Sequence, residues 1–201
     1  MAANQLKDGL YANFRTTKGD ILCRLEFKKT PMTVANFVGL ADGSQEWTDP
    51  KTGAVNSTPL YDGVVFHRVI PGFMIQGGDP LTKDPGKSGL FGTGGNTDKA
   101  GKPLNVKAEF NDVSHRRGVL SMARASDPDS ASSQFFVVVK DSPFLDRQYT
   151  VFGEVVKGLE VVDKIVTESN SDTSDPRSGG KPRAYQKILR IELVEQAPDK
   201  A

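Results

Sequence analysis

Residues 61 to 79, Tyr-Asp-Gly-Val-Val-Phe-His-Arg-Val-Ile-Pro-Gly-Phe-Met-Ile-Gln-Gly-Gly-Asp, decide the fold of this 201-residue chain. The alternation of side chains over residues 64 to 70 predicts a β-strand. Pro71-Gly72 is a turn signal, because proline presets one backbone angle and glycine accepts a positive one. The alternation resumes at Phe73, so a second strand is expected to return beside the first.

Arg68 is the unusual residue of this stretch, because its neighbours are apolar. Successive side chains of a strand point to opposite faces, so Phe66, Arg68 and Ile70 are expected to share one face. The turn would bring Gln76 back toward them. A cation, an amide and several apolar side chains then converge, which is typical of a site for an uncharged, partly apolar ligand with one polar handle.

The composition is that of one ordinary soluble domain, with 37% hydrophobic and 25% charged residues. Lys and Arg number 26 against 25 Asp and Glu, and the resulting net charge of +1 argues against a nucleic-acid partner. Cys23 is the single cysteine and is expected to be a buried thiol. No apolar run reaches membrane-spanning length and no secretion signal is evident, so no membrane association and a cytoplasmic location are expected.

The rest of the chain predicts strands with two helices among them. Thr30-Pro31 looks like a helix start, with Thr30 as the N-cap, and a helix is expected over residues 31 to 41. A second helix is expected from residue 159 to 166. A polar loop over residues 42 to 59 surrounds Trp47, which is expected to anchor it. The remaining strands are expected at residues 10–15, 21–27, 119–123, 134–139, 149–155 and 185–194.

The count of about eight strands and two helices, without βαβ alternation, favours an antiparallel barrel. Residues 83 to 103 form a glycine-rich loop. Gly86-Lys87-Ser88 ends like a phosphate-binding loop, but Leu81 occupies the position of the required glycine. A phosphate site is therefore not expected there.

Other chemistries fit the residues poorly. His67, His115 and Cys23 are too few and too scattered for a zinc site, so no metal is expected. A hydrolase that used Ser121 and His115 would need a third group to orient the histidine, and the sequence alone does not supply one. An arginine and a glutamine among apolar side chains suit a site that acts on a peptide electrostatically, without forming bonds.

The stretch Phe66-His67-Arg68-Val69-Ile70-Pro71-Gly72-Phe73-Met74-Ile75-Gln76-Gly77-Gly78-Asp79 resembles the signature of the cyclophilin family of peptidyl-prolyl cis-trans isomerases. The turn over residues 124 to 130 is more similar to bacterial than to animal members. Further matches follow in the same order as in the family: Gly118-Val119-Leu120-Ser121-Met122-Ala123, Ser133-Gln134-Phe135-Phe136, Phe144-Leu145-Asp146 and Val151-Phe152-Gly153.

The resemblance covers roughly residues 8 to 195 and implies a mainly β fold, a closed eight-stranded antiparallel barrel capped by two α-helices. It implies one domain over residues 1 to 201, with a surface insertion at 42–59 and short flexible termini. The implied activity is isomerisation of X-Pro bonds in peptides and folding proteins by a monomer without a cofactor. A domain on the same fold that only binds proline segments, as a chaperone or scaffold, is the alternative.

The resemblance also implies roles for ten residues. Arg68 and Gln76 match the catalytic pair. The substrate-binding positions are matched by Phe73, Met74, Ala123, Arg124, Phe136, Phe144, Leu145 and Tyr149. Phe144 replaces a tryptophan of the best-known animal pattern, Tyr149 a histidine and Arg124 an asparagine. Because Phe144 lacks an indole N–H donor, cyclosporin is expected to bind with reduced affinity.

Overall fold

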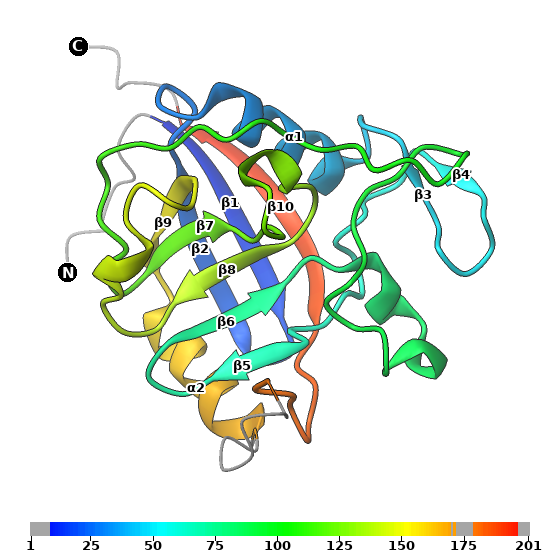
Figure 1. Ribbon diagram of the computed structural model, residues 1–201. Helices are drawn as coiled ribbons and strands as arrows, with labels where there is room; N and C mark the ends of the chain where they lie inside the picture. The colour runs from blue at the N-terminus through cyan, green and yellow to red at the C-terminus, as the bar shows by residue number, and fades with distance from the viewer. Residues whose placement is uncertain (1–8, 170, 172–178, 197–201) are drawn as a thin grey trace.

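The computed structural model describes residues 9–169, 171 and 179–196, so the expected flexible termini lie outside the described residues. Its centre is an eight-stranded antiparallel sheet in the order β10-β1-β2-β9-β7-β8-β6-β5. The sheet curls on itself, so that β5 to β8 cross in front of β1, β2 and β10 (Figure 1). The strands are β1 (Gly9–Thr16), β2 (Gly19–Leu25), β5 (Arg68–Ile70), β6 (Met74–Gly77), β7 (Val119–Met122), β8 (Phe135–Val138), β9 (Val151–Lys157) and β10 (Ile188–Gln196).

Both predicted helices are present, α1 (Pro31–Asp42) and α2 (Leu159–Ser169), and they cover opposite ends of the curled sheet (Figure 1). Phe37 of α1 is fully buried and lies at the centre of the core. Its ring centroid is 5.2 Å from those of Tyr61 and Phe152 and 5.9 Å from that of Phe135. The described residues also form four short 3₁₀ helices: η1 (Pro80–Lys83), η2 (Pro85–Lys87), η3 (Pro128–Ser130) and η4 (Pro143–Leu145).

The expected closed barrel is wrong, because the sheet stays open between β5 and β10. Within the described part, only the isolated bridge Val65↔Lys187 and a few backbone hydrogen bonds cross this gap, such as Phe66 N–H to the Gln186 carbonyl at 2.9 Å. The physical reason lies in residues 64 to 67, which leave regular strand geometry. The N–H of Val65, for example, donates to the Thr82 hydroxyl rather than to a strand.

The same irregularity overturns the expected shared face of Phe66 and Arg68. Phe66 and Val69 both pack in the main core inside the sheet, whereas Ile70 packs in a smaller apolar cluster on the other side. Only Arg68–Ile70 forms the ladder of β5, so the two-residue alternation does not extend back to Phe66. Arg68 is half-buried on the side of the smaller cluster.

Thr30 does not cap α1 as predicted. Its hydroxyl donates to the carbonyl of Glu26 instead. The first N–H groups of the helix, those of Met32 and Thr33, donate to the carboxylate of Glu109 at 3.1 and 2.8 Å. A carboxylate at a helix N-terminus satisfies free donors and complements the helix dipole. A residue some eighty positions away therefore does the capping.

The insertion at residues 42–59 contains a small hairpin of its own, β3 (Trp47–Thr48) and β4 (Val55–Asn56). Trp47 anchors it as predicted, because its side chain is buried and its indole N–H donates to the Thr58 carbonyl at 2.7 Å. No helix among the described residues is long and apolar enough to cross a membrane.

Candidate functional site

A cavity of about 170 Å³ opens where β5, β6 and β8 meet the segments after β7 and η4. Nine residues line it, and every one of them is among the ten positions to which the sequence resemblance gives a role. They are Arg68, Phe73, Met74, Gln76, Ala123, Arg124, Phe136, Leu145 and Tyr149. The structure therefore gathers residues from position 68 to position 149 around one space.

Strand register explains why these side chains meet. Arg68 of β5 lies directly opposite Gln76 of β6, and Gln76 lies opposite Phe136 of β8. Gly78 directly follows β6 and has a φ of 87°, and a Cβ there would lie 2.4 Å from the Ser133 carbonyl oxygen. Only glycine tolerates that backbone and that close approach, so Gly78 lets the polar edge of the site pack against the segment before β8.

Arg68 supplies a partly desolvated positive charge at the cavity wall. Its Nε donates to the Gly179 carbonyl at 2.8 Å and its Nη1 to Oε1 of Gln76 at 3.4 Å. Burial lowers the pKa of Arg68, although a guanidinium stays charged at any working pH. Among the described residues no carboxylate forms an ion pair with Arg68. Among the described residues, Arg68 is therefore held by neutral acceptors, the Gly179 carbonyl and the Gln76 amide oxygen.

Gln134, a residue for which no role was predicted, orients the side chain of Gln76. The amide nitrogen of Gln134 donates to the carbonyls of Gly92 and Gly94, at 2.9 and 2.7 Å, so its oxygen must face Gln76. Nε2 of Gln76 then donates to that oxygen at 2.8 Å and presents its own oxygen to Arg68. The sequence offered one clue to this role, because Gln134 is a polar residue directly before the apolar strand β8.

Arg124 forms one side wall of the cavity through its side chain. Its guanidinium lies 4.6 Å from the centre of the Tyr149 ring, within cation–π range. The same group donates to the carbonyls of Gln148, Ala125 and Ser126 at 2.8 to 3.1 Å. Arg124 thus fixes both Tyr149 and the polar turn that follows β7.

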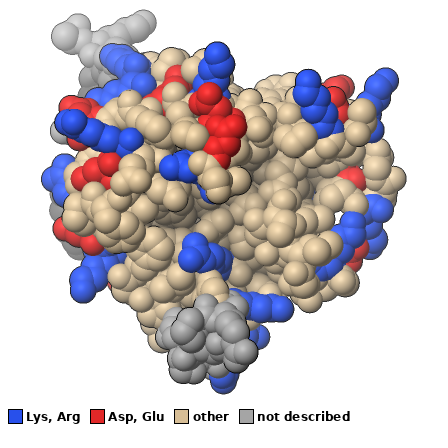
Figure 2. Space-filling view, in the orientation of Figure 1, with Lys and Arg blue, Asp and Glu red and all other residues tan. Residues whose placement is uncertain are grey.

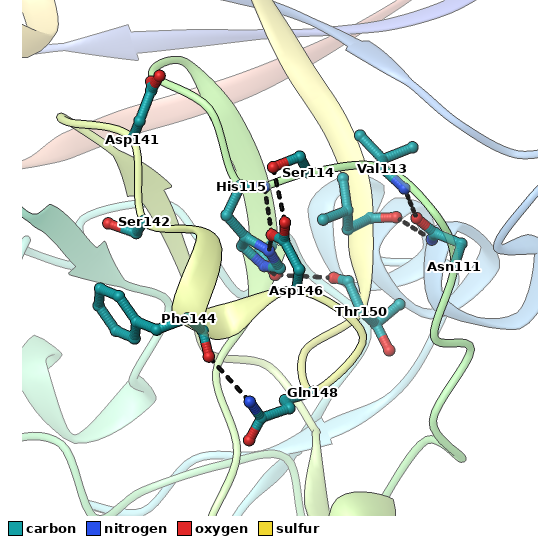
Figure 3. Close-up of polar contacts among 12 residues, drawn as sticks. Asn111, Val113, Ser114, His115, Asp141, Ser142, Phe144, Asp146, Gln148 and Thr150 are labelled. Atoms are coloured by element: carbon teal, nitrogen blue, oxygen red, sulfur yellow. Dashed lines mark hydrogen bonds and ion pairs between the residues drawn. The ribbon is translucent and has the colours of Figure 1, made fainter.

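Phe144 is the one expected substrate-binding residue that does not line the cavity. Its side chain is 63% exposed, and its ring packs against that of Phe73 at a centroid distance of 5.6 Å and an interplanar angle of 33°. Phe144 belongs to η4 and points away from Asp146 and His115 (Figure 3). It extends the apolar rim of the site instead of forming its wall.

Comparison with known proteins identifies the family. The family model described as "Cyclophilin type peptidyl-prolyl cis-trans isomerase/CLD" matches residues 11–192. The chain belongs to the cyclophilin-type peptidyl-prolyl cis-trans isomerases. A curated relative, peptidyl-prolyl cis-trans isomerase B of Streptomyces anulatus, is 42% identical over 174 residues, which cover 85% of this chain and 92% of the relative. Peptidyl-prolyl cis-trans isomerase A of Mycobacterium tuberculosis is 39% identical over 82% of this chain and 86% of its own length.

A solved cyclophilin from Cryptosporidium parvum is similar in three dimensions, with a TM-score of 0.70 and 28% sequence identity. The match covers 92% of this chain and 99% of the parasite protein, whose crystals were obtained in the presence of the dipeptide Ala-Pro. The bacterial relatives agree with the bacterial character of the turn at residues 124 to 130. The fold and the family that the resemblance implied are thus confirmed, apart from the closed barrel.

A second cavity of about 410 Å³ adjoins the first and shares Gln76, Ala123 and Arg124 with it. Its far wall is the glycine-rich loop from Gly92 to Thr97. Arg124 is the one charged residue of its lining. On the face shown in Figure 2, Lys and Arg alternate with Asp and Glu, without a broad area of one sign. The charged residues that line the two adjoining cavities are therefore Arg68 and Arg124.

His115 has the orienting group that was predicted to be missing. Its Nδ1 lies 3.0 Å from Oδ1 of Asp146, and its Nε2 lies 3.0 Å from Oγ of Ser121. The sequence-based objection to a hydrolase was therefore wrong. A different objection replaces it, because Ser121 and His115 are completely buried and neither lines the cavity. A substrate carbonyl has no route to the Ser121 hydroxyl.

Mild acid should destabilise this cyclophilin through its two buried histidines. Burial lowers the pKa of both His67 and His115 below the ordinary 6.5, so the unfolded chain takes up protons first as the pH falls. The two neutral histidines contribute their full share to the stability of the folded state above pH 6.5. This contribution is lost as the pH falls below 6.5 toward their lowered folded-state pKa values. The loss is up to about 1.4 kcal/mol per pH unit for each histidine. Urea unfolding at pH 7.5 and 5.5 tests this, and equal or greater stability at pH 5.5 would contradict it.

Proposed function

We propose that the 170 Å³ cavity receives the proline ring of an X-Pro segment and that Arg68 acts on the amide nitrogen of that proline. The apolar walls, Met74, Phe136 and Leu145, are buried and pack in one cluster with Phe73 and Tyr149. Such walls suit a small saturated ring. Burying a ring of this size contributes about 1.5–3 kcal/mol, so short peptides should bind weakly and the proline should dominate specificity.

The chemical task is to weaken amide resonance. The X-Pro bond rotates over a barrier of about 18–20 kcal/mol because its C–N bond has partial double-bond character. A bound rate on the order of 10³ s⁻¹ requires this barrier to fall by roughly 5–7 kcal/mol. As the bond twists, the nitrogen lone pair leaves conjugation and becomes a hydrogen-bond acceptor. A donor aimed at that nitrogen binds the twisted state more strongly than either planar state.

Arg68 is the donor that the geometry supports best. It is charged, lies at the cavity wall and has no carboxylate partner among the described residues. Gln76 and Gln134 form a chain of hydrogen bonds that limits how the guanidinium can move. We assign Gln76 the second role of contacting the substrate backbone, with Ala123 and Arg124 guiding the peptide past the cavity. No bond to the substrate forms at any step.

The test is an isomerase assay on a short X-Pro peptide with catalytic amounts of the protein. The proposed function predicts that the cis and trans forms interconvert faster in proportion to protein concentration. Binding of the peptide with interconversion at the background rate would instead support the alternative, a domain that only holds proline segments. We further propose that the protein acts as a monomer, because the cavity is complete within one chain.

Cyclosporin should bind more tightly after the substitution Phe144→Trp. Phe144 lies at the exposed rim, where an indole N–H could donate to a peptide carbonyl of the drug. One added hydrogen bond is worth about 0.5–1.5 kcal/mol, which corresponds to a two- to twelvefold gain in affinity. Titration calorimetry with the wild type and the variant measures this gain. The control is Phe27→Trp, at another exposed phenylalanine, which lies between β2 and α1; it should leave the affinity unchanged.

A further inference from the structure

His115 lies directly behind the proposed proline cavity, although it does not reach the cavity itself. Its ring stacks on Phe136 with a centroid distance of 6.1 Å and an interplanar angle of 15°. It meets the ring of Tyr149 edge-on at 6.4 Å and 83°. Phe136 and Tyr149 also contact each other, at 5.9 Å and 83°. One buried imidazole therefore supports two walls of the cavity at once.

Asp146 connects the same imidazole to a third wall. Asp146 directly follows Leu145, and its Oδ1 accepts from the backbone N–H of His115 at 2.7 Å as well as facing Nδ1 at 3.0 Å. Its Oδ2 accepts from the Ser114 hydroxyl at 2.7 Å. Figure 3 shows the Asp146 carboxylate pointing at Ser114 and His115. The position of η4, and with it that of Leu145, is thus fixed relative to His115.

The hydrogen bonds determine how the imidazole carries its proton. Nδ1 faces a carboxylate, which only accepts, so Nδ1 must carry the hydrogen. In the neutral ring Nε2 then accepts from the Ser121 hydroxyl. The Ser121 hydroxyl also lies 3.0 Å from the Thr150 carbonyl, to which it can donate when the ring is protonated and Nε2 is a donor. The hydrogen bonds therefore place a hydrogen on Nδ1, and burial of the ring favours the neutral form.

We propose that His115 is a positioning residue of the isomerase, whose neutral Nδ1–H form, set by Asp146, holds Phe136, Tyr149 and Leu145 in the arrangement that receives proline. The inference rests on the proposed role of the cavity. It assigns His115 no contact with the substrate. Its expected effect is on substrate binding, because the walls bind the proline ring equally in the planar and twisted states.

Burial of the ring opposes a positive charge on His115 and lowers its pKa. Asp146, the carboxylate in contact with the ring, acts in the opposite direction, and burial is the larger effect. Tyr149 presents an uncharged ring, over whose face the Arg124 guanidinium lies. On the histidine's own segment, Arg116 and Arg117 add two cations, and the side chain of Arg117 is turned to Asp163. β7 and β8 contribute Ser121 and Phe136, which carry no charge.

The first experiment records the nitrogen resonances of the two imidazoles by NMR in the full-length wild type. His115 should show the Nδ1–H form at pH 7 and should stay neutral well below pH 6.5. An Nε2–H form, or titration at or above pH 6.5, would overturn the proposal. This readout does not depend on activity, so it remains informative even if the protein proves to be no isomerase.

The second experiment separates positioning from general stability by steady-state kinetics on an X-Pro peptide. His115→Phe keeps a ring but loses the hydrogen bonds to Asp146 and Ser121. Asp146→Ala keeps the imidazole but removes its carboxylate partner. Each should raise KM two- to tenfold and change kcat less than twofold. Asp146→Asn should restore KM to within twofold, because its carboxamide oxygen still accepts from Nδ1–H and its nitrogen can donate to Ser114.

Ser114→Ala is the matched control, because it removes a hydrogen bond from Asp146 without touching the imidazole. It should leave KM within twofold of the wild type. A change in kcat alone for His115→Phe, or equal KM values for Asp146→Ala and the wild type, would overturn the proposal. If His115→Phe fails to fold, the two variants Asp146→Ala and Asp146→Asn and the NMR measurement still decide the question.

Discussion

Arg68→Ala should lower kcat/KM for an X-Pro peptide by about 10²–10³-fold, the typical cost of removing one donor aimed at the charge of a transition state. The loss should appear in kcat, because Arg68 is proposed to bind the twisted amide more strongly than the planar one. The apolar walls of the cavity remain intact in this variant, so the folded structure should persist. The peptide assay and a urea unfolding curve on the same sample measure both quantities.

Arg68→Lys tests the geometry of the donor and not only its charge. Lysine keeps the positive charge but lacks the planar fork that allows Arg68 to donate to Gly179 and Gln76 together. It should recover only a small part of the lost activity. Arg190→Ala is the control, because Arg190 is an exposed arginine paired with Glu192 on β10. A similar loss in both alanine variants, or full activity in Arg68→Lys, would contradict the proposed role.

Phe135→Ala should lose mainly stability and Phe136→Ala mainly activity, although the two residues are adjacent in β8. Phe135 is fully buried in the core against Phe14, Phe37 and Tyr61, with ring centroids 5.5 to 5.9 Å apart. Its truncation should cost about 3–5 kcal/mol of stability. Phe136 lines the cavity, and its truncation should lower kcat/KM by about tenfold or more through KM, because the proline ring loses a wall.

Urea unfolding and the peptide assay on both variants check this pair. Under conditions where each variant is folded, Phe135→Ala should keep most of its activity per folded molecule. Phe136→Ala should remain more stable than Phe135→Ala, because one side of its ring faces the cavity. The opposite pattern, with activity lost in Phe135→Ala and kept in Phe136→Ala, would mean that the cavity does not receive the substrate.

The strands and helices were predictable because their hydrophobic periods are local. The alternation around Cys23 and the helical spacing around Phe37 each appear within about ten residues, and both elements are present. Closure of the barrel was not predictable in this way. It depends on whether β5 and β10 form a continuous ladder across more than a hundred residues of sequence, and the irregular backbone before Arg68 prevents this.

The candidate site could be assembled from sequence only where a family signature connects distant segments. Nine of the ten expected residues line the cavity, whereas periodicity alone would have placed Phe136 and Leu145 in the core. Phe144 lies at the rim because η4 turns its side chain outward. The supporting contacts of Gln134, Glu109 and Asp146 could not be foreseen, because each joins segments distant in sequence.

The most direct test of the role of Arg68 measures binding and interconversion separately. NMR titration of an X-Pro peptide gives Kd, and exchange between its cis and trans resonances gives the rate in the bound state, for the wild type and for Arg68→Ala. We expect Kd to change less than about threefold and the bound interconversion rate to fall about a hundredfold or more. A bound rate equal to that of the wild type, with all of the lost activity explained by weaker binding, would contradict the proposal that Arg68 stabilises the twisted amide.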